Sequence, residues 1–333
     1  MAMWRPVTRV VTDRPLVFKP LALVRTTLLA SNNVAFGFGL AFFGAIAFSA
    51  KAIIVKLAYR HGVDAVTLLM YRMLFSLPVF VVMAWWASRD KAALTGKDWA
   101  GVLGLGFTGY YLASFLDFMG LQHISASLER LILYLGPTLV LVLGLLLYQR
   151  PVGRRQAVGM MISYSGVVLV FGHELTLQSG NVGLGAMLVF LSAVSYAVYL
   201  TYSGELVQRL GSLRLVGLAT SVACLLCIAQ FVLLRPLSSA LVAAPVIWLS
   251  VLNATLCTAV PVLMVMMAIE RIGASMASQI GMVGPLSTIL MGVWILDEPF
   301  TLWVAAGTVL VMTGIFVVTR RTMGNRRSNH RGP

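Results

Sequence analysis

The sequence predicts an all-α integral membrane protein whose ten transmembrane helices form two inverted five-helix repeats. Of its 333 residues, 59% are hydrophobic and 11% are charged, whereas charged residues make up about a quarter of a typical soluble domain. Long apolar runs follow one another with short polar connections, which is the pattern of a chain dissolved in a bilayer. The chain also repeats itself, because residues 124–170 align with residues 272–318 without a gap.

Ten apolar runs have roughly the 17–25 residues that cross a bilayer. Their approximate limits are 34–58, 64–87, 99–121, 124–147, 155–172, 182–204, 215–234, 246–268, 272–295 and 302–319. Four segments follow from them. These are a basic cytoplasmic N-terminal segment (1–33), a first repeat (34–172), a second repeat (182–319) and a basic cytoplasmic tail (320–333).

The repeat aligns small residues and helix-breaking residues of the two halves. At the constant spacing between the halves, the Gly-Pro pair at 136–137 falls on 284–285, and the glycines at 159 and 166 fall on those at 307 and 314. Five spans in each half is an odd number, so the second half must enter the membrane from the opposite side. Such inverted repeats are a common way to build a transporter around a site near the middle of the membrane.

Basic residues set the predicted orientation. With the N-terminus inside, 19 of the 25 Lys and Arg residues lie in segments that face the cytoplasm, while the outer loops contain only Arg60 and Arg235. This is the positive-inside pattern, and it accounts for the net charge of +14 without a nucleic-acid partner. The first 33 residues lack a clear apolar core before a small-residue cleavage site, so we expect no signal peptide. Both termini are predicted to be cytoplasmic, in the inner (plasma) membrane.

Two matching stretches resemble a known family. In "FMGLQHISAS" and in "MMAIERIGAS", an apolar span ends in a short polar turn and small residues, and a Gly-Pro pair follows in the next span. Together with the ten spans, this pattern resembles the drug/metabolite transporter superfamily, EamA type, over nearly the whole chain. The segments "LLLYQRP" and "WILDEP" look like that family's closing "GE" segment. The second keeps an acidic residue, Glu298, whereas the first has Arg150 there.

The resemblance implies a polytopic inner-membrane carrier, often an exporter, with a central cavity between its halves. It indicates little about the substrate, because related proteins transport amino acids, purines, drugs and sugar phosphates.

Six ionisable residues fall within the predicted spans, all in the first repeat. They are Lys51, Lys56, Arg72, Asp117, Glu129 and Arg130. A charge in hydrocarbon is unfavourable unless it is paired or hydrated. At a rise of about 1.5 Å per residue, the six lie roughly 6–13 Å from the outer loops, in one layer. We expect Glu129 to pair with Lys51 or Arg72, and Asp117 with Arg130 or Arg72.

Two interpretations of this layer remain open. One is a static set of ion pairs that holds the first four spans together. The other is an outer gate or an anchoring site for the substrate, whose carboxylates could also carry protons. A shallow lysine such as Lys56 can instead extend its ammonium group to the membrane surface.

Polar and aromatic side chains also recur on single helix faces. Serines and tyrosines in 192–203 share one face, as do Tyr110, Ser114 and Asp117. Such stripes either bond a neighbouring helix or line a wet cavity. The residues predicted to bind substrate or to gate are Lys51, Arg72, Tyr110, Ser114, Asp117, Glu129, Arg130, Tyr134, Tyr196, Tyr199 and Gln279. The predicted helix hinges are Pro137, Pro261 and Pro285, where a backbone hydrogen bond is lost.

Other function classes lack their motifs. No G-x-x-x-x-G-K-[ST] loop occurs, and no clustered catalytic or metal-binding residues occur, so neither an ATPase nor an integral membrane enzyme is expected. The C-x-x-C at Cys224 to Cys227 lies within an apolar run without a second ligand pair. We expect no cofactor and no metal.

The sequence therefore predicts a secondary transporter that moves a small amino-acid-like or amphipathic metabolite, as an exporter, by alternating access. An exchanger of organic anions or phosphorylated metabolites and an uncoupled facilitator remain alternatives. The expected partners are the substrate, the lipid bilayer and, if transport is coupled, protons. The protein is expected to be a monomer or a homodimer.

Overall fold

A computed structural model describes residues 20–149, 152–177 and 180–328, except for the side chains of residues 20–34, 177, 274, 275, 278, 279 and 319–328. All regular structure in these ranges is helical. The helices are α1 (Pro20–Tyr59), α2 (Ala65–Ser88), α3 (Gly96–Leu105), η1 (Gly106–Leu112), α4 (Ala113–Leu121), α5 (Ala126–Leu133), α6 (Gly136–Tyr148), α7 (Arg154–Leu177), α8 (Val182–Leu210), α9 (Ser212–Leu234), η2 (Leu237–Ala240), α10 (Ala244–Ala254), η3 (Thr255–Ala259), α11 (Val260–Gly281), α12 (Val283–Leu296) and α13 (Leu302–Ser328).

Eight helical stretches in the described residues are long and apolar enough to cross a membrane. They are Ala35–Tyr59, Ala65–Ser88, Gly96–Leu121, Ala126–Tyr148, Arg154–Thr176, Val182–Leu210, Ser212–Leu234 and Ala244–Gly273. Each lies within several residues of a predicted span. The last two predicted spans correspond to shorter apolar helices, Val283–Leu296 and Leu302–Val318. The ninth is shorter because Gly273 is non-helical (φ 79°) and α12 begins only at Val283.

Side-chain caps fix where several helices begin. Asp64 accepts hydrogen bonds from the backbone of Val66 and Thr67 at the start of α2. Thr95 and Asp98 form a reciprocal capping box at the start of α3. Ser125 accepts from the Leu128 backbone at the start of α5. Each cap satisfies a backbone N–H that has no partner inside its helix.

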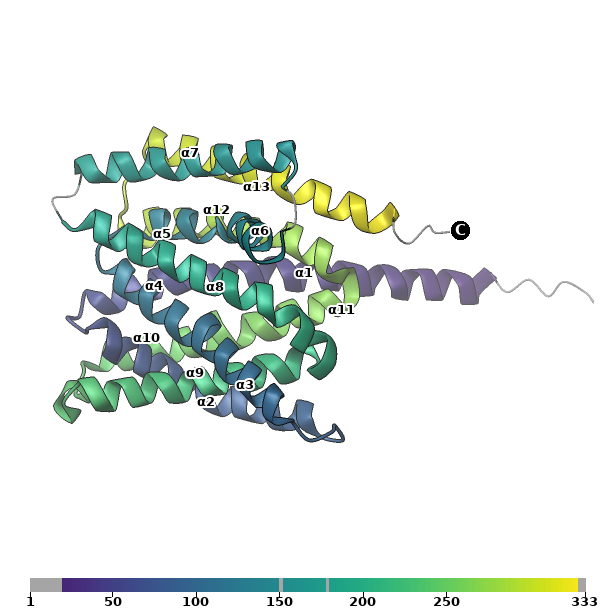
Figure 1. Ribbon diagram of the computed structural model, residues 1–333, viewed down its shortest axis with the longest axis horizontal. Helices are drawn as coiled ribbons and strands as arrows, with labels where there is room; N and C mark the ends of the chain where they lie inside the picture. The colour runs from purple at the N-terminus through teal and green to yellow at the C-terminus, as the bar shows by residue number, and fades with distance from the viewer. Residues whose placement is uncertain (1–19, 150–151, 178–179, 329–333) are drawn as a thin grey trace, which may run out of the picture.

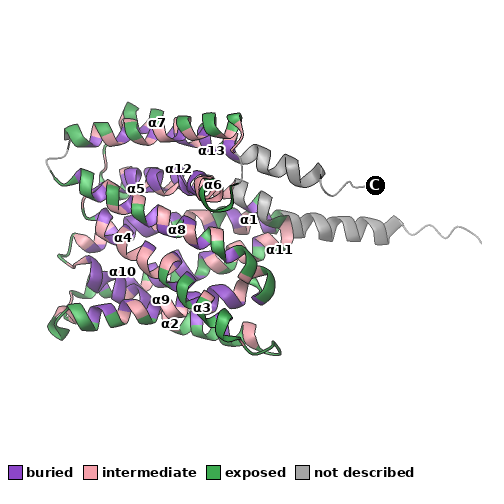
Figure 2. Cartoon of the chain, viewed as in Figure 1, coloured by how far each residue is buried: buried purple, intermediate pink, exposed green. Residues whose placement is uncertain are grey.

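The helices lie roughly parallel to one another in one bundle (Figure 1). α7 and α13 pack side by side along one edge, and α2 and α9 pack together at the opposite edge, with α3 and α10 next to them. Between them run α1, α4, α8 and the pairs α5–α6 and α11–α12. Buried residues face the interior, and exposed residues cover the outward faces of α7, α2 and α9 (Figure 2). We call the end with connections 60–64, 122–125 and 297–301 the Glu298 end, and the end with connection 89–95 the Asp98 end.

The outward faces carry large apolar side chains, as lipid contact requires. Exposed aromatic residues lie near both ends. Among the exposed aromatic residues, Trp85, Trp86 and Trp99 lie towards the Asp98 end, and Trp248, Trp294, Phe300 and Trp303 lie towards the Glu298 end. Aromatic belts of this kind mark the two interfaces of a membrane protein.

The edge formed by α7 and α13 shows reciprocal contacts between the two repeats. A Cβ atom placed on Gly166 would lie 2.7 Å from the carbonyl oxygen of Gly307, and one on Gly307 would lie 2.8 Å from that of Gly166. Gly159 and Gly314 meet in the same way. In the repeat alignment, Gly159 corresponds to Gly307 and Gly166 corresponds to Gly314. Gly159 therefore contacts the counterpart of Gly166, and Gly166 contacts the counterpart of Gly159. The two helices run antiparallel there, which fits an inverted repeat.

Irregular backbone also recurs at aligned positions. The π-helix η1 interrupts the span that ends at Leu121, and the π-helix η3 occupies the aligned position in the second repeat. Gln149 and Asp297 align as well, and both have left-handed backbone (φ 53° and 59°) where they end α6 and α12. Because non-glycine residues rarely adopt this conformation, its recurrence shows that the repeats share local geometry as well as helix order.

Candidate functional site

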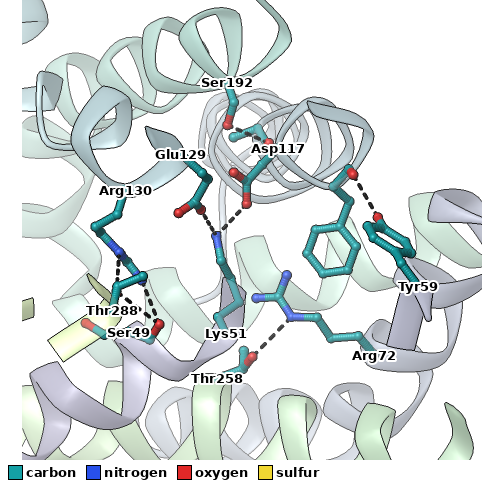
Figure 3. A network of polar contacts seen from close by, with 12 residues as sticks. Ser49, Lys51, Tyr59, Arg72, Asp117, Glu129, Arg130, Ser192, Thr258 and Thr288 are labelled. Atoms are coloured by element: carbon teal, nitrogen blue, oxygen red, sulfur yellow. Dashed lines mark hydrogen bonds and ion pairs between the residues drawn. The ribbon is translucent and has the colours of Figure 1, made fainter. Parts of the chain in front are cut away.

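A lysine ammonium lies between two buried carboxylates in the middle of the bundle (Figure 3). Lys51 of α1 bonds Asp117 of α4, and its Nζ lies 3.2 Å from Oε1 of Glu129 on α5. The exposed fractions are 5% for Lys51, 2% for Asp117 and 0% for Glu129. One positive charge is therefore shared by two negative ones in a region that water hardly reaches.

Two arginines flank this cluster and reach the second repeat. Nε of Arg72, on α2, donates to Oγ1 of Thr258 at 3.2 Å. Nε of Arg130, on α5, donates to Oγ1 of Thr288 at 2.9 Å, and its Nη2 donates to the Ser49 carbonyl at 3.1 Å. Figure 3 shows the two guanidinium groups on either side of Lys51. Both threonines belong to the second repeat, so the charged residues of the first repeat are held partly by hydroxyls of the second.

The π-helix η3 places Thr258 for its contact with Arg72. In this helix, Oγ1 of Thr258 donates to the carbonyl of Asn253, five residues earlier, at 2.9 Å. The hydroxyl proton is thereby used within the helix, which leaves a lone pair on the oxygen to accept from Arg72. π-Helical turns are often found at functional sites.

Aromatic faces cover the two arginines. The guanidinium carbon of Arg72 lies 5.3 Å from the centre of the Phe118 ring, and that of Arg130 lies 5.8 Å from the centre of the Phe48 ring. A cation over an aromatic face gains electrostatic energy, and more so where water is excluded. These rings help to keep the two charges stable inside the bundle.

Several buried polar atoms of the described residues have no hydrogen-bond partner. Among them are Oδ1 of Asp117, Oε2 of Glu129, the hydroxyl of Ser76 and the side-chain amide of Asn253. Ser76 lies one turn after Arg72 on the same face of α2. Unsatisfied polar groups in an interior are unfavourable and call for water or a ligand.

The predicted pairing is partly confirmed. Glu129 contacts Lys51, as expected. The expectation that Asp117 pairs with Arg130 or Arg72 is wrong, because Asp117 forms its ion pair with Lys51. Among the described side chains, neither arginine forms an ion pair. Lys56 lies nearer the surface, in the wall of a cavity at the Glu298 end.

The tyrosines of the second repeat form an aromatic group against η1. The hydroxyls of Tyr110 and Tyr199 lie 3.2 Å apart, and the rings of Tyr196 and Tyr199 stack at 5.4 Å. Tyr199 is buried, whereas Tyr196 and Tyr202 are exposed on the surface of the bundle. Tyr199 also aligns with Lys51. The stacked pair of Tyr196 and Tyr199 in the second repeat therefore lies at the position that Lys51 and its charged cluster occupy in the first repeat.

The serines of the same helix bond a neighbouring helix. Ser192 donates to the carbonyl of Ala113 at 2.7 Å, and Ser195 donates to that of Thr108 at 2.8 Å. Thr108 lies in η1, where a π-helix frees carbonyls from their usual partners. For these two serines the structure supports interhelical bonding.

The remaining predicted site residues lie in different surroundings. Ser114 is half-buried on α4. Tyr134 donates to the carbonyl of Gly281 at 2.9 Å and so joins the break between α5 and α6 to the break between α11 and α12. The side chain of Gln279 lies outside the described residues.

The three prolines follow breaks or irregular turns. Pro137 lies in the first turn of α6, Pro285 is the third residue of α12, and Pro261 comes just after η3. Proline is tolerated in a first helical turn because its missing N–H would have no partner there. Their function as hinges stays a prediction.

Two carboxylates that the sequence reasoning did not place at a site hold the start of α5. Oε1 of Glu298 accepts from the Ala126 backbone at 2.7 Å, and Oε2 accepts from the Ser127 hydroxyl at 2.9 Å. Glu174 accepts from the hydroxyl of Ser125. Carboxylates at a helix N-terminus satisfy unpaired N–H groups and favour the helix dipole. The retained acid of the "DEP" segment was the signal that could have identified Glu298.

A cavity of about 330 Å³ opens beside this contact at the Glu298 end. It is lined by Lys56, Tyr59, Arg60, Leu121, Gln122, Leu296 and Glu298. Nη2 of Arg60 donates to the carbonyl of Leu296 at 2.8 Å, which joins the end of α1 to the end of α12. The two repeats are thus tied together around the mouth of this cavity.

No group of three or more potential metal ligands occurs among the described residues. The cysteines Cys224, Cys227 and Cys257 are free and buried. Sγ of Cys224 lies 3.7 Å from Sδ of Met73, within an apolar cluster. The C-x-x-C spacing is therefore explained by packing.

Comparison with known proteins places these features in a family. The EamA-like transporter family matches the chain twice, over residues 35–172 and 183–320. The uncharacterized transporter YcbK of Bacillus subtilis (strain 168) is 29% identical over 287 residues, which covers 82% of this chain and 90% of that protein. An uncharacterized transporter of Archaeoglobus fulgidus is 26% identical over 228 residues, which covers 68% of this chain and 79% of that protein.

A solved crystal structure shares the fold. It has a TM-score of 0.58 and 17% identity, and the match covers 86% of this chain and 98% of the other.

Proposed function

The chain belongs to the EamA-like transporter family, and from that premise we propose that it is a secondary active exporter of small metabolites that works by alternating access. It is a multi-pass membrane protein whose named relatives are transporters. We further propose that α12 and α13 complete ten spans in two inverted repeats, with the site between them.

The observation that carries the proposal is the buried charged cluster at the boundary between the repeats. Lys51, Asp117 and Glu129 come from the first repeat, while the hydroxyls that hold Arg72 and Arg130 come from the second. A relative movement of the repeats changes these contacts directly. A site whose ligands belong to both moving parts can couple its own occupancy to that movement.

Charge distribution supports the orientation. The Asp98 end carries the basic connections, and the helix ends that lead to the two termini lie there (Figure 1). Under the positive-inside rule this end faces the cytoplasm of the inner membrane, and the Glu298 end faces outwards. The cavity beside Glu298 is then the outer vestibule of the transport path.

The two carboxylates supply a means of coupling. Asp117 and Glu129 share the ammonium of Lys51, and both have oxygens without a hydrogen-bond partner among the described residues. The single ammonium of Lys51 cannot fully compensate both carboxylates, and we propose that one of them takes up and releases a proton. Binding and release of that proton on opposite sides would couple transport to the proton gradient.

A counterflow screen tests the proposal. The purified chain is reconstituted into liposomes preloaded with one unlabelled compound, and uptake of the same labelled compound is followed for amino acids, nucleobases and organic acids at two pH values. We expect saturable exchange for one class and, in liposomes without preloaded compound but with an imposed pH gradient, accumulation of that class that an uncoupler abolishes. Flux that an uncoupler leaves unchanged would identify a facilitator, and no exchange above protein-free liposomes would refute transport of these classes.

A further inference from the structure

We propose that Arg72 and Arg130 bind an oxyanion group of the transported compound, so that the substrate is a small organic anion with a carboxylate or phosphate group. This inference rests on the proposed transport function and names its substrate class. It follows from the hydrogen-bonding capacity that the two arginines leave unused.

Each guanidinium is buried but only partly satisfied. The exposed fraction is 6% for Arg72 and 5% for Arg130. A guanidinium has five N–H donors. In the described residues, Arg72 uses its Nε to donate to Thr258, and Arg130 uses Nε and Nη2 to donate to Thr288 and Ser49. Both Nη groups of Arg72 and the Nη1 group of Arg130 therefore have no acceptor there.

The Nε contact of Arg72 leaves the opposite edge of its guanidinium group free, whereas Arg130, whose Nη2 donates to the Ser49 carbonyl, keeps only Nη1 free among the described residues. A threonine hydroxyl occupies the Nε side, so the end formed by the two Nη groups of Arg72 is available. A planar carboxylate or a phosphate accepts two parallel hydrogen bonds from such an edge. Because the threonines fix the Nε side, little freedom is lost when an anion binds the other.

A structural role alone does not account for the arrangement. A purely structural network would pair arginines with carboxylates, since this geometry is the strongest available. Here the lysine takes both carboxylates, while neither arginine has a carboxylate partner among the described side chains. The five charged groups carry three positive and two negative charges when all are ionised, and one bound anion balances them.

Both arginines lie next to the cluster of Lys51, Asp117 and Glu129, so a ligand held by an arginine also lies close to this cluster. Arg130 bonds the Ser49 carbonyl, two residues before Lys51 on α1. Arg72 covers the ring of Phe118, the neighbour of Asp117. Ser76 and Asn253, with unpaired buried polar groups, adjoin Arg72 and its partner Thr258. These neighbouring polar groups are available to bond the rest of the ligand.

The test compares an anion with its neutral isostere on the purified full-length chain. Thermal unfolding is measured with increasing benzoate, benzamide or phenyl phosphate at constant ionic strength. We expect benzoate to raise the unfolding midpoint in a saturable manner and benzamide to leave it unchanged. The relative affinity of phenyl phosphate and benzoate distinguishes a phosphorylated substrate from a carboxylate.

Variants assign the effect to the two arginines. Arg72→Gln and Arg130→Gln should each weaken apparent benzoate affinity about 10- to 100-fold, the effect of a lost charged hydrogen bond. Arg72→Lys and Arg130→Lys keep the positive charge but lack the forked donors of a guanidinium, so they test whether that geometry is needed. They also provide variants with an intact charge in case the Gln variants do not fold. Arg214→Gln is the matched control, since Arg214 is also buried but bonds Ser88 and Ala92 at the Asp98 end. It should lower the midpoint without changing benzoate affinity.

Three results would overturn the inference: equal effects of benzoate and benzamide, no effect of either anion, or wild-type benzoate affinity in both Gln variants. The counterflow screen separates this failure from that of transport. Exchange of a neutral or cationic compound without anion binding would support the transport function and refute the anion site. Anion binding without exchange of any compound would support the anion site and refute the transport function.

Discussion

The hydroxyl of Ser163 donates to the carbonyl of Gly159 at 3.1 Å and also lies 3.5 Å from the carbonyl oxygen of Val311, and Ser163 and Val311 are 148 positions apart. They occupy the same place in the two repeats, so a residue meets its own counterpart where α7 packs against α13. In a twofold arrangement, only residues on the axis contact their own equivalents. The pseudo-twofold axis that relates the repeats therefore passes between these helices at Ser163.

The first prediction concerns the close approach at this axis. Gly166→Val adds atoms where a Cβ would already lie 2.7 Å from the Gly307 carbonyl oxygen. We expect the free energy of unfolding to fall by about 1–3 kcal/mol, the usual cost of overpacking, in denaturant titrations of the purified protein. Gly172→Val is the control on the same helix, where a Cβ meets no atom within 4 Å. Equal losses in the two variants would argue against close packing at the axis.

The second prediction concerns the shared lysine. Lys51→Met leaves Asp117 and Glu129 buried without their cation, and we expect a loss of about 3–5 kcal/mol in the free energy of unfolding. Adding Asp117→Asn and Glu129→Gln to the same chain should restore most of this loss, because no buried carboxylate is then left without its cation. The measurement is a comparison of the single, double and triple variants. Strictly additive losses would show that the three side chains do not act as a unit.

The third prediction tests proton coupling in transport. Asp117→Asn and Glu129→Gln, made separately, keep the size of each side chain and remove its titration. If these carboxylates carry protons, each variant should lose transport, or keep exchange while losing accumulation driven by a pH gradient. Counterflow and gradient-driven uptake in the same liposomes distinguish the two outcomes. Full gradient-driven activity in both variants would exclude them as proton carriers.

The fourth prediction concerns the contact of Glu298 with the start of α5. Glu298 belongs to the second repeat and accepts from Ala126 and Ser127 of the first. Glu298→Ala removes this link, so we expect the Glu298 end to open more often. The probe is Leu121→Cys in a cysteine-free background, because Leu121 lies beside the cavity but is fully buried. Its rate of labelling by a polar maleimide should rise in the Glu298→Ala variant.

Gln122 provides the matched control for this labelling. It lines the same cavity and is exposed. Gln122→Cys should therefore react at a similar rate with or without Glu298. An unchanged rate at position 121 would show that this contact does not limit access from the Glu298 end. An equal rise at both positions would indicate general unfolding of the region.

Much of the fold could be predicted from the sequence, because bilayer thickness imposes a length and a composition on each span. The break at Gly273 could not, since the residues around it read as one apolar run. The π-helices η1 and η3 could not be predicted either, because the extra residue in a π-helical turn leaves no clear signal in the amino-acid composition. The repeat could be read directly, but the contact of Ser163 with Val311 required the packing of the two halves.

The charged residues of the candidate site were predicted, but their pairing was predicted only in part. Burial of a charge is unfavourable enough to identify Lys51, Asp117 and Glu129 within apolar runs. Which cation meets which carboxylate depends on how each helix is rotated, and side-chain spacing within one helix does not give that. The contact partners Thr258 and Thr288 were missed for the same reason. A threonine in a span becomes informative only once its neighbouring helix is known.

The fifth prediction concerns the ion pair between Asp64 and Arg235, whose Oδ1 and Nη2 lie 3.1 Å apart at the Glu298 end. Burial raises the pKa of Asp64, but hydrogen bonds from Thr67 and Val66 and the charge of Arg235 outweigh burial, so the pKa is below its ordinary value. A carboxyl whose pKa is lowered by folding stabilises the protein above its unfolded pKa of about 3.9. This stabilisation is lost as the pH falls through the native pKa.

Asp64→Asn keeps a helix-capping side chain and removes the charge. At neutral pH we expect it to lower the free energy of unfolding by about 0.2–1 kcal/mol, as for other partly exposed ion pairs. The difference from the wild type should close as the pH falls below about 4. Denaturant titrations across this range provide the measurement, with Arg235→Gln as the partner variant. In the Arg235→Gln background, Asp64→Asn should cost less. A cost for Asp64→Asn that is independent of both pH and Arg235 would assign the effect to the cap instead of the ion pair.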